Sequence, residues 1–248
     1  MSDVKAKIEP QIDLNGGDEP PLSTPMENGQ RRTVRDQAID ALRQALITGR
    51  IVPGNPLTLR GLAATLGTSP MPVREAIRTL AAENALEIRP NGRIQVPQMT
   101  EQRFEDLVKA RVLLEPEAAI AALDHLDAAA IDHLQSLDDA IDATLETGDV
   151  EGYMRLNHAF HFALYGASGS KVFLTLIESL WLQFGPFMRT VYGRVGTIKL
   201  VDQHKEALDA IRAGEADVLR QAIAADILDG MRMMGIALLP DADVTARI

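Results

Sequence analysis

The stretch that decides the fold is Ser69–Leu80, SPMPVREAIRTL. Serine is a preferred N-cap of helices, and the residue after it is proline, which is favoured at the first helical position. Val73, Ile77 and Leu80 follow one another at spacings of four and three, so one face of the helix is apolar. The stretch therefore predicts a helix that begins directly after Ser69 and runs to about Asn84.

The neighbouring segments complete a recognisable unit. Leu59–Leu66 is a short helical stretch just before the decisive one, and Thr33–Gly49 upstream has apolar residues at helical spacing. Two short apolar stretches, 85–88 and 94–96, flank Pro90-Asn91-Gly92, which predicts a β-hairpin. Helix, tight turn, helix and hairpin indicate a winged helix-turn-helix, whose second helix enters the major groove of DNA.

The charge of the chain is unevenly distributed. The net charge of −10 at pH 7, taken as one number, argues against DNA binding. Residues 31–96 nevertheless hold ten Arg against five Asp or Glu, a balance of +5, whereas residues 1–30 come to −4 and residues 97–248 to −11. A basic segment on an acidic body is typical of a DNA-binding module joined to a different domain.

The rest of the chain is predicted to be helical. Spans with helical spacing cover 101–124, 127–147, 149–168, 171–193, 197–213 and 215–238, and no β-like alternation interrupts them. The fold class is therefore mainly α: an N-terminal winged helix-turn-helix followed by an all-helical antiparallel bundle. The expected boundaries are a disordered arm (1–32), the DNA-binding domain (33–97), an effector-binding and dimerisation domain (98–239) and a tail (240–248).

Composition excludes several classes of function. Without cysteine the chain has no disulfide, thiolate zinc finger or cysteine nucleophile. No stretch reaches the roughly 18 apolar residues that span a bilayer, and the acidic N-terminus has no apolar run of signal-peptide length. The expectation is a cytoplasmic protein with no membrane partner.

The first 60 residues of the ordered part resemble the GntR family of bacterial transcription regulators. The resemblance rests on Ile47-x-Gly49-x-Ile51-x-Pro53-Gly54, Leu57-x-x-x-x-Leu62-Ala63-x-x-Leu66-Gly67, Ser69-x-x-Pro72-Val73-Arg74-Glu75-Ala76-Ile77-x-x-Leu80 and the wing glycine Gly92. It implies that DNA is contacted by Arg60, Ser69, Met71, Pro72, Arg74 and Gly92. Many relatives carry Arg where this chain has Pro70, so one base contact of the family is in doubt here.

Other charged residues of this unit have simpler interpretations. Arg89 and Arg93 lie in the wing and are expected to contact phosphate. Glu75 is expected to pair with an arginine of the same molecule rather than to read a base. Arg78 fits equally well as a DNA contact or as a solvated surface charge.

Residues 101–238 resemble the helical ligand-binding domain of the FadR-like (FCD) branch of this family. The matching pieces are Arg111-x-x-Leu114-Glu115, Asn157-x-x-Phe160-His161 and His204-x-x-x-Leu208-x-Ala210-Ile211-x-Ala213-Gly214-Glu215. Metal-binding members of the branch hold a divalent ion with one Asp and three His. The corresponding positions here are Asn157, His161, His204 and Asp226, so the first and last ligands differ from the family pattern.

This altered set still suits a divalent cation. Two imidazoles, one carboxylate and one amide oxygen are acceptable donors for zinc, nickel or manganese, and Asp226 keeps one negative charge in the set. The alternative is that His161 and His204 are buried histidines that only form hydrogen bonds inside the bundle.

Arg111 is the expected effector-binding residue. The resemblance implies that it points into the ligand cavity, and a guanidinium binds a carboxylate through two parallel hydrogen bonds, which suits a small organic acid. The alternative is a salt bridge to Glu115 at i, i+4.

The sequence as a whole favours a homodimeric repressor, not an enzyme, that binds double-stranded operator DNA under the control of a small carboxylate effector. Two other interpretations stay open. One is a metal-dependent hydrolytic enzyme, and the other is a DNA-binding protein whose helical domain only dimerises.

Overall fold

The computed structural model describes residues 26–27, 30–195 and 203–239. The expected tail and the start of the 197–213 span lie outside this range, as does most of the expected disordered arm. Within the arm, the strands β1 (Met26–Glu27) and β2 (Gln30–Arg31) pair in antiparallel fashion, so this part of it has regular structure.

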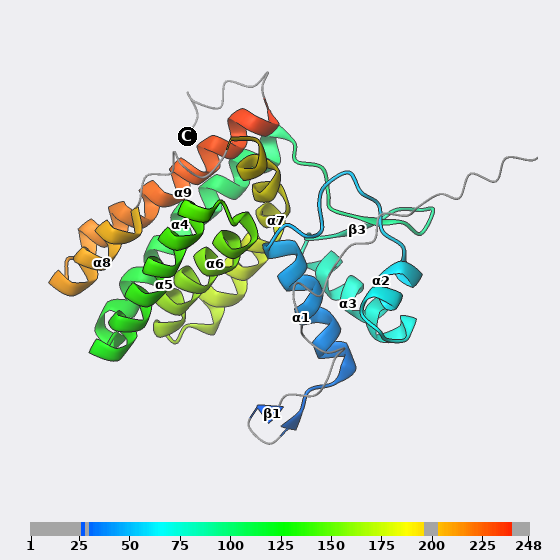
Figure 1. Cartoon of the computed structure of the whole chain (residues 1–248), viewed down its shortest axis with the longest axis horizontal. Coiled ribbons are helices and arrows are strands. Elements are labelled where there is room, and N and C mark those ends of the chain that lie inside the picture. Colours follow the sequence, from blue (N-terminus) through cyan, green and yellow to red (C-terminus); the bar gives the residue numbers. More distant parts are fainter. Residues whose placement is uncertain (1–25, 28–29, 196–202, 240–248) are drawn as a thin grey trace, which may run out of the picture.

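The N-terminal unit forms three helices and a hairpin, as predicted (Figure 1). Helix α1 (Val34–Ile47) begins with a capping box between Thr33 and Asp36. Helices α2 (Leu59–Thr65) and α3 (Pro70–Ala82) form the helix-turn-helix, and strands β3 (Glu87–Ile88) and β4 (Ile94–Gln95) pair as the wing. The predicted apolar face of α3 is fully buried.

The remaining described residues form the predicted helical bundle. Its members are α4 (Glu101–Ala122), η1 (Leu123–His125), α5 (Ala128–Thr147), α6 (Val150–Ala167), α7 (Lys171–Val195), α8 (Gln203–Ala213) and α9 (Ala216–Leu238). Helix α4 packs along α9, α5 along α6, and α8 along both α5 and α9. The span expected to end at residue 124 instead closes with the short 3-10 helix η1.

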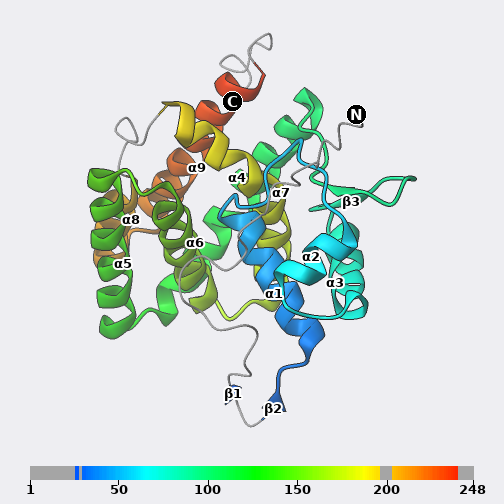
Figure 2. The same ribbon diagram turned by 45° about the vertical axis from the view of Figure 1, so that its right-hand side comes forward.

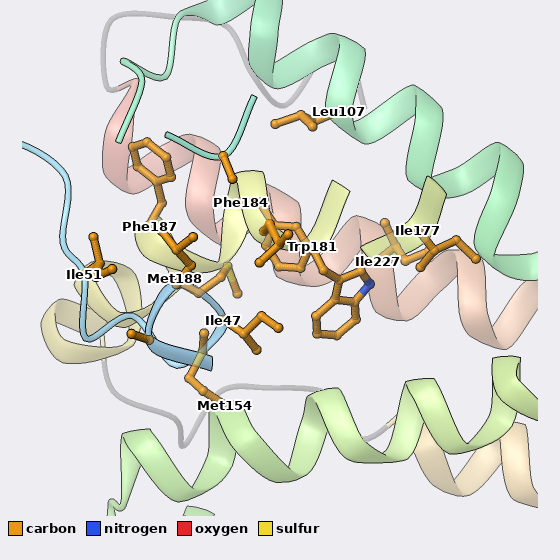
Figure 3. Close-up of a cluster of buried hydrophobic side chains, with 14 of the residues drawn as sticks. Ile47, Ile51, Leu107, Met154, Ile177, Trp181, Phe184, Phe187, Met188 and Ile227 are labelled. Carbon is orange, nitrogen blue, oxygen red and sulfur yellow. The ribbon is translucent and has the colours of Figure 1, made fainter. Parts of the chain in front are cut away.

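One hydrophobic core runs through both units. Helix α1 lies against α7 and separates the bundle from α2 and α3 (Figure 2). Ile47 and Ile51 of the first unit lie beside Phe187 and Met188 of α7, with Met154 of α6 close by (Figure 3). The two units therefore share buried apolar surface.

The approach of α1 to α7 requires glycine. A Cβ at Gly185 of α7 would lie 3.0 Å from both Ile47 Cα and Leu46 O, which are backbone atoms that cannot move aside cheaply. At Gly49, φ is +67° and an added Cβ would come within 2.5 Å of Arg189 Cβ. The two helices are thus in backbone contact, and larger residues at these positions would separate them.

Polar contacts also join α7 to the C-terminal end of α3. Arg43 of α1 binds Glu83, the C-cap of α3, at 2.6 Å and pairs with Glu178 of α7 as well. Ser179 Oγ of α7 donates to the Glu83 carbonyl at 3.3 Å. Arg103 of α4 donates to the carbonyl of Asn84 at 2.8 Å. Carbonyls at the end of the expected recognition helix are therefore held by the bundle.

Across the described residues, no helix is both long enough and apolar enough to cross a membrane.

Candidate functional site

The residues expected to contact DNA are accessible. Arg60 lies in the first turn of α2, and Ser69, Met71 and Arg74 lie at the N-terminal end of α3; all four are exposed, and Pro72 is partly buried. Neither Arg60 nor Arg74 forms an ion pair or side-chain hydrogen bond with any described residue. Their guanidinium groups are thus available to an incoming ligand.

The other arginines on this side of the molecule are partly engaged. Arg78 pairs with Glu75 at 3.0 Å, which confirms Glu75 as an intramolecular partner of an arginine. Arg89 of the wing pairs with Glu87 at 3.0 Å. The predicted phosphate contacts of Arg89 and Arg93 stay predictions.

The N-terminus of α3 differs from a usual helix start. Ser69 occupies the predicted N-cap position with extended backbone angles, but its hydroxyl makes no capping hydrogen bond. The reason is that the third helical residue, Pro72, has no N–H to donate, and neither has Pro70. Among the first three helical residues, only Met71 keeps a backbone N–H. This terminus therefore offers fewer N–H donors to a phosphate than a helix without proline would.

The wing turn depends on the backbone of Gly92. Its φ is +76°, and its N–H donates to the carbonyl of Arg89 at 2.8 Å. A Cβ at Gly92 would meet nothing within 4 Å, so glycine is needed for the backbone conformation rather than for space. The resulting tip is exposed.

The predicted metal ligands come together inside the bundle. His161 on α6, His204 on α8 and Asp226 on α9 place one donor atom each within 4.8 Å of one another. His161 Nε2 lies 3.2 Å from Asp226 Oδ2 and 3.4 Å from His204 Nε2, and His204 Nε2 lies 3.9 Å from Asp226 Oδ1. Asn157, one helical turn before His161, has a buried Oδ1 without a hydrogen-bond donor among the described residues.

These distances fit a small cation. Donor atoms about 2.0–2.1 Å from a tetrahedral Zn²⁺ lie roughly 3.4 Å apart from one another. The separations of His161 Nε2 from its two neighbours are close to that value, and Asn157, whose Oδ1 has no hydrogen-bond donor among the described residues, lines the adjacent cavity. The residues present therefore fit a divalent metal ion.

The electrostatics of the cluster favour an ionised carboxylate. Burial by itself would raise the pKa of Asp226, but the neighbouring His161, His204 and Arg111 side chains outweigh burial and lower that pKa to about 2. The set thus retains the negative charge that a cation requires.

The remaining histidines lie outside the cluster. Burial, aided by the charge of His161, lowers the pKa of His158 to about 4, and its ring stacks on Phe162 with centroids 4.1 Å apart. These contacts give His158 a packing role. His125 and His133 are exposed.

A small cavity opens beside the metal-ligand cluster. Its volume is about 50 Å³, and its walls include Arg111, Asn157, Trp181, His204 and Asp226. A water molecule needs about 10–15 Å³ by the same measure. The cavity therefore accommodates an ion with a few waters.

Arg111 forms the salt bridge that its sequence position suggests, and it also lines the cavity. Its Nε and Nη2 atoms lie 2.5 and 3.2 Å from the two carboxylate oxygens of Glu115, so the i, i+4 salt bridge is present and buried. The guanidinium also lies over the rings of Phe184 and Trp181, 3.9 and 5.0 Å from their centroids. Because Arg111 also lines the cavity, its predicted effector contact stays a prediction.

Sequence reasoning missed two buried residues that touch the cluster. Asp138 of α5 lies 3.4 Å from His204 Nδ1, and the Tyr165 hydroxyl of α6 lies 3.0 Å from His161 Nδ1. Tyr165 follows His161 at i+4, which could have signalled a contact. Nothing in the sequence distinguishes Asp138 from the other acids of α5, because only the packing of α5 on α8 brings it to His204.

Known proteins share this architecture over most of their length. Residues 34–96 match the model of the bacterial regulatory proteins of the gntR family, and residues 106–229 match the FCD domain. The HTH-type transcriptional regulator McbR of Escherichia coli K12 is 29% identical over 191 residues, covering 76% of this chain and 86% of McbR. A probable D-xylose utilization operon transcriptional repressor of Paenarthrobacter nicotinovorans is 27% identical over 193 residues, covering 78% and 85%.

A solved structure has the same fold. The structure of E. coli McbR/YncC superimposes with a TM-score of 0.78 at 27% identity, covering 82% of this chain and 97% of that one. With both halves of the chain matched in order, this protein belongs to the GntR family of DNA-binding transcription regulators, in the FadR-like branch that carries an FCD domain.

Proposed function

We propose that this regulator is a homodimeric repressor whose affinity for operator DNA is controlled by a small organic acid bound, together with a divalent metal ion, in the cavity of the FCD domain. The observation that carries the proposal is the convergence of His161, His204 and Asp226 beside a cavity that Asn157 and Arg111 also line.

The donor set limits the choice of metal. Imidazole nitrogens suit zinc and nickel, while carboxylate and amide oxygens also suit manganese. When bound, the ion would add positive charge to the cavity wall and leave coordination positions for a ligand oxygen. His161, His204, Asp226 and Asn157 would hold it, and Arg111 would orient a carboxylate of the effector through its planar guanidinium.

The route from cavity to DNA runs through α7. Trp181, Phe184 and Met188 on one face of this helix line the cavity. Glu178 and Ser179, close to them in sequence, contact Arg43 and the end of α3. An acid bound here would press on these three cavity-lining side chains and would thereby shift α7 and, with it, the recognition helix.

On the DNA side, Arg60, Met71 and Arg74 would contact bases or phosphates, with Ser69, Pro72 and Gly92 bringing the backbone close. The accessible, unpaired guanidinium groups of Arg60 and Arg74 support these assignments. A dimer engaging two half-sites would supply the affinity that one such unit lacks.

The test uses the full-length protein and an operator selected from genomic fragments, with binding followed by fluorescence anisotropy. In the presence of Zn²⁺, Ni²⁺ or Mn²⁺, at least one small mono- or dicarboxylate should change operator affinity by about 5–150-fold. If no such acid has an effect at saturating concentration, the sensing part of the proposal is refuted and a purely dimerising helical domain is favoured.

Arg111→Lys sharpens the same test. Lysine keeps the positive charge beside Glu115 but loses the bidentate geometry, so the effector response should weaken while operator binding persists. Loss of the dimer, seen by light scattering, or unfolding would instead assign Arg111 a structural role.

A further inference from the structure

The strongest unexplained feature of the bundle is the buried carboxylate of Asp138. Its side chain is about 1% exposed, and neither of its oxygens has a hydrogen-bond donor within bonding geometry among the described residues. His204 Nδ1 lies 3.4 Å from its Oδ1. An isolated buried carboxylate is strongly unfavourable, so this position calls for a positive partner on the side of His204.

The second imidazole has a matching arrangement. The hydroxyl of Tyr165 donates to Glu115 Oε2 at 2.9 Å and lies 3.0 Å from His161 Nδ1. Because the single hydroxyl proton is given to Glu115, the tyrosine oxygen accepts, and His161 must carry a proton on Nδ1. Glu115 is in turn neutralised by Arg111. His161 is thus linked through Tyr165 to a buried carboxylate, as His204 is linked directly to Asp138.

We propose that Asp138 and the Tyr165–Glu115 pair are positioning residues of the metal site: they hold both imidazoles with the proton on Nδ1, so that both Nε2 lone pairs point at the ion. This inference rests on the metal site proposed above. It assigns a function to residues that contact only the ligands, not the ion.

Geometry distinguishes this arrangement from ordinary buried histidines. The two Nε2 atoms are 3.4 Å apart, and both face Asp226. With Nδ1 protonated on both rings, lone pairs and a carboxylate converge on one point, which is favourable only around a cation. Metal-bound histidines typically donate their other N–H to a carboxylate or carbonyl, and loss of that partner costs about 10–100-fold in metal affinity.

The decisive experiment measures metal affinity and imidazole protonation together in the full-length protein. Zn²⁺ affinity is determined by chelator competition for the wild type, Asp138→Asn and Tyr165→Phe. Asp139→Asn, which makes the same charge change at an exposed position of the same helix, is the matched control. We expect Asp138→Asn and Tyr165→Phe each to weaken Zn²⁺ binding by about 10–100-fold and Asp139→Asn to leave it unchanged.

The nitrogen NMR spectrum of histidine-labelled protein supplies a readout that a merely structural role would not move. In the metal-free wild type, His204 should carry its proton on Nδ1, and in the Zn²⁺ form both rings should bind through Nε2. A proton on Nε2 of His204, or unchanged affinity in both variants, would overturn the inference even if one variant folds poorly. A wild type that binds no Zn²⁺ would instead refute the metal site itself, and this inference with it.

Discussion

The DNA-reading unit and the bundle handle charge in opposite ways. In the former, Arg60 and Arg74 are exposed and have no partners among the described residues, so their charge acts on an approaching polyanion. In the bundle, Arg111 and Glu115 are buried and bound to each other, and Asp226 faces two imidazoles. A surface that recognises DNA needs accessible charge, whereas a small-ligand site needs charge that is buried, paired and fixed in direction.

The largest expected effect comes from removing one partner of the buried ion pair between Arg111 and Glu115. Glu115→Ala would leave the guanidinium of Arg111 buried without its carboxylate and would remove the acceptor of Tyr165. Removing one partner of a buried ion pair costs about 3–5 kcal/mol, so the free energy of unfolding, measured by urea denaturation, should fall by that amount. The control is Glu117→Ala, on the same helix as Glu115, which removes an exposed ion pair with Arg220 of α9. Its expected cost is below about 1 kcal/mol.

An equal, small effect of both substitutions would mean that Arg111 finds solvent when Glu115 is lost. The bundle site would then be less enclosed than the contrast requires.

The next largest effect concerns the ligand cluster. His161→Ala removes the donor nearest to both other ligands and should weaken Zn²⁺ binding by more than about 100-fold, beyond the range expected for residues outside the ligand set. His133→Ala, an exposed histidine on α5, is the control. Chelator competition measures both. Equal affinity of His161→Ala and the wild type would place any bound metal elsewhere.

Loss of an exposed charge should have a smaller effect, seen only on DNA. Arg74→Ala should weaken operator binding by about 1–3 kcal/mol without changing thermal stability. Arg78→Ala removes the same charge from the same helix, but Arg78 is already paired with Glu75, so its cost should be lower. Anisotropy at several salt concentrations measures both variants. If the two cost the same, the net charge of the surface matters more than the position of Arg74.

The same contrast explains what the sequence could and could not predict. The reading unit is continuous in the chain, so local signals such as Ser69 before proline and the turn at Gly92 predicted its elements. The bundle site draws on α4, α6, α8 and α9, and only the resemblance to known regulators brought His161, His204 and Asp226 together. Asp138 was missed because its contact with His204 arises from helix packing, which leaves no local pattern.

The sequence also predicted the start of α3 without predicting that Ser69 makes no capping hydrogen bond there. Ser69 and the prolines were recognised as a helix start, but Pro72 removes the N–H that the serine would cap. The start of the helix follows from local propensity, whereas the capping hydrogen bond depends on a backbone donor three residues after Ser69. Predicting the element therefore did not predict the bond.

The smallest expected effect tests whether the two regions communicate. Ser179→Ala on α7 removes the hydrogen bond to the carbonyl of Glu83 at the end of α3, a contact of 3.3 Å worth about 0.5–1.5 kcal/mol. Its position between the cavity wall and the recognition helix means that part of this loss should appear in the coupling, as a reduced ratio of operator affinities with and without effector. Ser136→Ala, whose exposed hydroxyl lies on α5, should leave that ratio unchanged. A reduced ratio in Ser179→Ala but not in Ser136→Ala would show that α7 carries the signal, and an unchanged ratio would assign transmission to the backbone contact of α1 with Gly185 instead.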